Sequence, residues 1–158
     1  MPAPALLLIS RDDILSVMEG PHSDRAFRLL AALTRKGYHL LATAPQPSTW
    51  TGAHGSPDDA LLGPNSIRKR LADAGGALDG VYYVRRSMFT QKRNREDALR
   101  DILERYATRP ENTILLSSKR NFVKAAQKLG LNAILLGAEQ ELVAELIRLS
   151  GAGSTTEA

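Results

Sequence analysis

The sequence predicts an α/β fold in which a mainly parallel, five-stranded sheet is covered by helices on both faces. The first observation is that residues 5–9 form a short, wholly apolar run that ends abruptly at a polar turn, residues 10–13. Such a run is typical of a strand buried on both sides. The second is that four more apolar runs alternate with stretches of helical periodicity. This alternation favours right-handed crossovers between parallel strands.

Composition limits the broad class of protein. A chain of 158 residues fits one domain, which we expect over residues 1–150, with a flexible tail over residues 151–158. The absence of cysteine excludes disulfides and thiolate metal sites. We also expect a cytoplasmic location without membrane association, because no apolar run approaches the roughly 18 to 20 residues that span a bilayer and the start lacks a basic signal region.

The first half of the chain supplies two strands and one clear helix. After the first strand we expect a loop containing Gly20 and Pro21, and then a helix capped by Ser23 and ended by Gly37. Five apolar side chains share one face of that helix: Ala26, Phe27, Leu29, Leu30 and Leu33. A second buried strand is expected over residues 38–43. Residues 44–64, rich in Pro, Gly and Ser, predict a long loop that is either functional or mobile.

The second half continues the alternation. A short helix over residues 66–74 precedes a third strand over residues 81–84, and a basic loop over residues 85–95 leads into a helix that ends before Pro110. The inner face of that helix is apolar: Ala98, Leu99, Ile102, Leu103 and Tyr106.

Two further strands complete the sheet. The fourth is expected over residues 113–116 and the fifth over residues 133–136. Ser117 or Ser118 is the expected cap of the helix between them, which ends at Gly130. A last helix turns inward its apolar side chains Leu142, Val143, Leu146 and Ile147.

The carboxyl ends of parallel strands meet at one edge of a sheet. That edge should gather residues 10–13, 43–48, 85–95 and 117–121 with Gly137. Ligands of open α/β sheets bind there, so these polar residues form the candidate site.

Several segments of this chain carry a family resemblance. They are the opening strand and its turn, Leu41-Ala42-Thr43, and the stretches at residues 78–83, 103–106 and 125–130. The order of parts resembles the small capless phosphatases of the haloacid dehalogenase superfamily, most closely the group acting on histidinol phosphate and heptose bisphosphates. The resemblance implies a three-layer, Rossmann-like fold without a cap domain, and in the family a magnesium-dependent phosphohydrolase.

The first family motif is D-x-D-G, and here it reads Ser10-Arg11-Asp12-Asp13. In the family the first Asp attacks phosphorus and binds magnesium, and the second is the general acid and base. The resemblance therefore places Ser10 at the nucleophile position and Asp12 at the acid/base position, while Asp13 replaces the glycine.

The remaining motifs are also altered. Thr43 matches the hydroxyl of the second motif, and Arg93 lies near the lysine of the third, K-P-x-P-G. The fourth motif, G-D-x-x-x-D, aligns with residues 117–122, so Ser118 and Phe122 replace its two metal-holding carboxylates. The Cys/His zinc loop of the group is replaced by Val84-Arg85-Arg86.

These changes favour anion binding over magnesium chemistry. Mg²⁺ needs several hard oxygen ligands, and Asp12 is the one carboxylate left by the motifs. Residues 85–128 hold twelve Lys or Arg against five acids. We therefore expect no metal or other cofactor and no active phosphohydrolase. The residues expected to bind phosphate come from the predicted carboxyl edge of the sheet: Ser10, Arg11, Asp12, Thr43, Arg93, Ser117, Ser118 and Lys119.

The leading hypothesis is a catalytically inactive phosphatase-like protein that binds a phosphorylated small molecule or another anion. The alternatives, in order, are a protein-interaction or homodimer module, a weak phosphohydrolase, and a nucleic-acid binder, which ranks last because no aromatic platform is recognised. Plain structural roles remain open: Ser117 and Ser118 as helix caps, and the basic excess as a solvated face.

Overall fold

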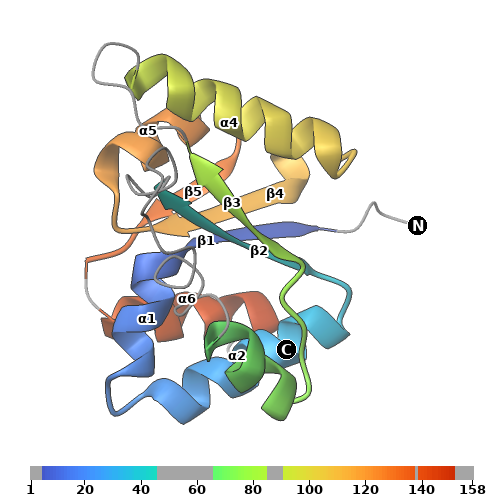
Figure 1. Ribbon diagram of the computed structural model, residues 1–158, viewed down its shortest axis with the longest axis vertical. Coiled ribbons are helices and arrows are strands. Elements are labelled where there is room, and N and C mark those ends of the chain that lie inside the picture. The colour runs from blue at the N-terminus through green and yellow to red at the C-terminus, as the bar shows by residue number, and fades with distance from the viewer. Residues whose placement is uncertain (1–4, 46–65, 85–90, 138, 152–158) are drawn as a thin grey trace, which may run out of the picture.

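The computed structural model describes residues 5–45, 66–84, 91–137 and 139–151. They form a five-stranded, fully parallel sheet of order β3-β2-β1-β4-β5, with helices on both faces (Figure 1). The predicted fold class is confirmed. The strands are β1 (Leu6–Ser10), β2 (His39–Pro45), β3 (Gly80–Val84), β4 (Thr113–Ser117) and β5 (Asn132–Leu135).

Strand β1 is the centre of the sheet, as its apolar sequence predicts. Leu8 lies opposite Leu41 of β2 on one side and Leu115 of β4 on the other. All five residues of β1 are buried. Because side chains alternate along a strand, Leu7 and Ile9 enter one hydrophobic cluster and Leu6 and Leu8 the other.

The helices divide between the two clusters (Figure 1). The first face carries α1 (Arg11–Met18), α2 (Ser23–Arg35), the helical residues 66–73 and α6 (Glu139–Ser150). The second carries α4 (Gln91–Arg105) and α5 (Arg120–Lys128), with the short 3₁₀ turn η2 (Pro110–Asn112) before β4. Within the described residues, no helix is both long and apolar enough to cross a membrane.

Helix α1 follows β1 directly, so the prediction of a loop straight after the first strand is wrong, and the turn that contains Gly20 and Pro21 comes after α1. Asp12 and Asp13 lie in its first turn, where negative charge favours the helix dipole. Ile14 and Val17, three residues apart, are buried against the sheet. Ser23, the predicted cap, is instead the first residue of α2.

Two more boundaries differ from the prediction. Helix α4 begins at Gln91, so Arg93 and Arg95 are helical and do not belong to a basic loop. Neither Ser117 nor Ser118 is the cap of α5, because that position is Lys119, without a side-chain capping bond. The helix ends at Gly37 and Gly130 are confirmed by their φ angles of 107° and 92°.

Smaller differences remain. Strand β2 extends to Pro45, and β5 lies one residue earlier than predicted, at Asn132–Leu135. The predictions for most of the long loop, for residues 85–90 and for nearly all of the tail lie outside the described residues.

Helix α4 is fixed to the edge strand by a polar network. The Tyr82 hydroxyl of β3 donates to the Asp101 carboxylate, and Arg105 Nε donates to both Asp101 oxygens at 3.1 Å. The Tyr82 hydrogen bond, and then Arg105, lower the pKa of Asp101. This network helps to set the position of α4, and with it the part of α4 that reaches the carboxyl edge of the sheet.

Candidate functional site

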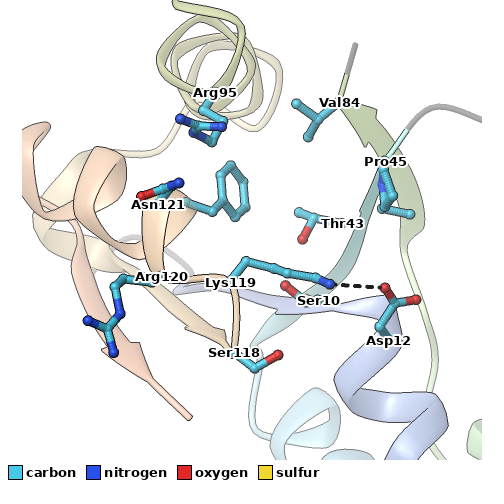
Figure 2. A pocket seen from close by; sticks show the side chains of 12 residues that line it. Ser10, Asp12, Thr43, Pro45, Val84, Arg95, Ser118, Lys119, Arg120 and Asn121 are labelled. Carbon is cyan, nitrogen blue, oxygen red and sulfur yellow. Dashed lines mark ion pairs between the residues drawn. The ribbon is translucent and has the colours of Figure 1, made fainter. Parts of the chain in front are cut away.

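A cavity of about 540 Å³ lies at the carboxyl ends of the strands (Figure 2). Its size falls in the range of small-molecule pockets. The turns after β1 and β4, the ends of β2 and β3, and the start of α4 all contribute to it. The lining residues are Ser10, Asp12, Thr43, Ala44, Pro45, Val84, Arg95, Ser118, Lys119, Arg120, Asn121 and Phe122.

Five of the eight residues predicted from sequence line this cavity: Ser10, Asp12, Thr43, Ser118 and Lys119. Three do not. Arg11 and Ser117 are not lining residues, but each forms a hydrogen bond to one: Arg11 to Asp12, and Ser117 to Ser10. Arg93 lies apart from the lining residues: its side chain is 81% exposed, and its Nε is 3.9 Å from Asp97.

Arg95 lines the cavity where Arg93 was expected. The helical periodicity of the sequence indicates why Arg95, and not Arg93, lines the cavity. Arg95 precedes Ala98 by three residues and Leu99 by four, so it shares their buried helical face. Arg93 is five residues before Ala98 and is rotated away from that face. Aligning the third motif by residue spacing does not take into account which face of the helix each arginine occupies.

Ser10, which lines the cavity, forms a buried pair with Ser117. Ser10 Oγ and Ser117 Oγ are 2.5 Å apart, and both residues are buried. The backbone N–H of Lys119 donates to Ser117 Oγ at 3.0 Å. The side chain of Ser117 therefore links the end of β1 to the turn before α5.

Asp12 is contacted by a cation at each carboxylate oxygen. Arg11 donates to Oδ1 from Nε at 3.3 Å and from Nη2 at 3.1 Å. Lys119 Nζ lies 3.5 Å from Oδ2, as the dashed line in Figure 2 marks. The charge of Asp12 is therefore balanced from both sides before any ligand arrives.

Asp13 makes a third contact between the same two turns. Its Oδ2 accepts a hydrogen bond from the backbone N–H of Ser118 at 2.9 Å. We call the three contacts, Ser10–Ser117, Asp12–Lys119 and Asp13–Ser118, the turn clasp. It joins the β1–α1 turn to the β4–α5 turn through five side chains and the backbone N–H of Ser118.

Ser117→Ala should lower the free energy of unfolding by about 1–3 kcal/mol, because the Ser10 hydroxyl and the Lys119 N–H both lose this buried partner. Urea denaturation followed by circular dichroism measures the loss. Ser118→Ala is the matched control: its side chain is exposed, so its effect should stay within about 0.5 kcal/mol. Equal stabilities for the two variants would show that the serine pair contributes nothing.

The cavity is poorly suited to magnesium. Among its lining residues Asp12 is the single carboxylate, and its two oxygens already face Arg11 and Lys119. In the part of the chain that the structure describes, no three His, Asp or Glu side chains gather as metal ligands. Mg²⁺ prefers a near-octahedral array of oxygens and normally includes carboxylates, so this donor set does not fit it.

Phe122, which the sequence resemblance aligns with the last carboxylate of the fourth motif, belongs to the core. It is 4% exposed and joins the cluster that contains Leu8, Leu99 and Ile102. Phe122 also lines the cavity. The site therefore has an apolar wall where the motif would place a negative charge.

The comparisons with known proteins establish the fold. No family model and no curated protein matches the sequence. A solved D,D-heptose 1,7-bisphosphate phosphatase from B. bronchiseptica, complexed with magnesium and phosphate, superposes with a TM-score of 0.69 at 18% identity, over 98% of this chain and 99% of that one.

Two more solved structures are similar. A D,D-heptose 1,7-bisphosphate phosphatase from Burkholderia thailandensis gives a TM-score of 0.59 at 20% identity, over 89% of this chain and 84% of that one. An uncharacterized protein from Corynebacterium glutamicum gives 0.60 at 18% identity, over 94% and 96%. At the level of fold, the resemblance to haloacid dehalogenase-like phosphatases is confirmed.

Proposed function

We propose that this protein binds a phosphate-bearing ligand or another anion in the cavity at the carboxyl edge and leaves it unhydrolysed. The observation that carries the proposal is the charge balance of the lining: Arg95, Lys119 and Arg120 against Asp12, whose oxygens are both paired with cations. Such a lining attracts anions.

The polar groups of the cavity suit a phosphate. Ser10, Thr43 and Ser118 bring hydroxyls to it, and Lys119 and Arg95 bring positive charge. The buried Nε of Arg95 has no hydrogen-bond partner among the described residues. A buried donor without a partner costs free energy. The Arg95 guanidinium, which lines the cavity, could form charge-assisted hydrogen bonds with phosphate oxygens.

The same geometry opposes hydrolysis. A serine hydroxyl attacks phosphorus only when a neighbouring base takes its proton. The neighbour of the Ser10 hydroxyl is the hydroxyl of Ser117, at 2.5 Å, and Asp12 is engaged with Arg11 and Lys119. The lining also does not fit the magnesium ion with which the B. bronchiseptica phosphatase was crystallised. Ligand retention without cleavage is the chemistry this arrangement supports.

Arg95→Ala should abolish most of the rise in melting temperature that inorganic phosphate gives the wild-type protein, because a ligand that binds the native state stabilises it. Arg93→Ala is the matched control, since it removes the same charge from a side chain outside the cavity. Differential scanning fluorimetry at increasing phosphate measures both. A phosphate shift that is lost equally in both variants, or absent from the wild type, contradicts the proposal.

An assembly role is the second hypothesis from the sequence, and the described surface gives it less support. Leu135 of β5, which is 41% exposed, is the one large hydrophobic side chain classed as exposed among the described residues. Stable homodimer interfaces are richer in apolar area. Anion binding therefore ranks first.

A further inference from the structure

The lysine of the turn clasp retains most of its capacity to bind. Lys119 Nζ carries three N–H donors, and its contact with Asp12 is 3.5 Å long, beyond the usual length of a charge-assisted hydrogen bond. The Lys119 side chain is 55% exposed. The ammonium is therefore loosely held at one side and open to a ligand at the other.

Asp12 does not cancel the charge of Lys119. Arg11 donates twice to Oδ1 of Asp12, while Lys119 approaches Oδ2. The three side chains together carry one net positive charge. Because Arg11 lies outside the lining and Lys119 within it, that net charge is presented to the cavity at Lys119.

The side chain of Lys119 lies at the floor of the cavity. In Figure 2 it extends toward Asp12, with Ser10 and Thr43 drawn beside it, and all four residues line the same cavity. Arg120 also lines the cavity, but its guanidinium points away from this group in the same view. Lys119 thus extends its ammonium to Asp12, within the lining that also holds Ser10 and Thr43.

We infer that the Lys119 ammonium is the cation that receives the phosphate group of the ligand, and that Asp12, held by Arg11, is its positioning residue. This inference rests on the proposed anion binding at the same cavity. An ammonium placed between a carboxylate and a bound phosphate offsets part of the phosphate charge, a role that a divalent ion fills in metal-dependent sites. Phosphate recognition is accordingly independent of metal.

The test is isothermal titration calorimetry of inorganic phosphate into the full chain, with EDTA and then with Mg²⁺. Lys119→Met should weaken phosphate binding about tenfold or more, because a charge-assisted hydrogen bond is lost. Lys119→Arg, which keeps the charge, should restore most of the affinity. Lys124→Met is the matched control, because Lys124 is exposed on α5 outside the cavity. Wild-type affinity should be the same in EDTA and in Mg²⁺.

The outcomes separate the two proposals. If the wild type binds phosphate and Lys119→Met weakens binding no more than Lys124→Met, the inference is overturned and the proposed function stands. A wild type that binds no phosphate overturns the proposed function itself. Asp12→Asn should lower the affinity, because Lys119 loses the contact that orients it. A higher affinity in Asp12→Asn would show that Asp12 competes with the ligand and would overturn its positioning role.

Discussion

Phe122→Ala is expected to lower the free energy of unfolding by about 3–5 kcal/mol, the usual cost of truncating a buried phenylalanine. Phe122 is 4% exposed and packs in the cluster with Leu8 and Leu99, beneath the cavity. Because a domain is stable by only about 5–15 kcal/mol, this one change should remove a large part of the total.

Phe122→Asp should be more damaging still, although it introduces the residue that the sequence resemblance predicts at this position. It loses the same packing and places a carboxylate in an apolar cluster, where an unpaired charge is strongly disfavoured. Urea denaturation measures both variants, and Asn121→Asp, which introduces the same group at the exposed neighbouring position, is the control. A Phe122→Asp protein as stable as the wild type, and newly stabilised by Mg²⁺, would show that this position belongs to a latent metal site.

Hydrolysis of p-nitrophenyl phosphate by the wild type should not exceed the rate without protein, with or without Mg²⁺. The difference from an active phosphatase should be large, because enzymes commonly accelerate such reactions by a factor of about 10⁶ or far more. The physical reason is the lining: Ser10 faces another hydroxyl, and Asp12 faces two cations. A continuous absorbance assay of p-nitrophenolate at high protein concentration measures it.

Asp12→Asn is the control that gives this assay its meaning. Magnesium-dependent turnover that is present in the wild type and lost in Asp12→Asn would establish a phosphohydrolase and refute the proposal of binding without cleavage. Turnover that persists in Asp12→Asn would come from a contaminating enzyme. One of the solved heptose-bisphosphate phosphatases, assayed in parallel on its own substrate, confirms that the magnesium conditions allow catalysis.

The strands were predictable because a strand that is buried on both faces has an almost continuous apolar sequence. The runs that became β1, β2 and β4 are almost wholly apolar, and the crossover rule then places their ends at one edge. Helix α1 was missed because it has only eight residues and buries two apolar side chains, Ile14 and Val17. Asp12 and Asp13 were therefore interpreted as turn residues, when they begin a helix.

The location of the candidate site was predictable from the sequence, but the contacts between its side chains were not. The topology brings Ser10, Thr43 and Ser118 to one cavity, as expected from their places at or just beyond the carboxyl ends of strands. Arg95 lines the cavity and Arg93 does not, a difference that motif spacing could not predict because it ignores the rotation of a helix. The turn clasp has no local signal, because Ser10 and Ser117 are 107 residues apart and a strand pattern does not specify which side chains of two turns meet.

The central place of β1 has a consequence for how the chain is made. β1 is synthesised first, yet one of its two neighbours, β4, begins only at Thr113. As the chain leaves the ribosome, β1 therefore keeps one edge unpaired until Thr113–Ser117 has emerged more than 100 residues later. Closing such a distant parallel ladder is slow, so the nascent protein should depend on late pairing, and on chaperones that shield an open strand, to reach its native state.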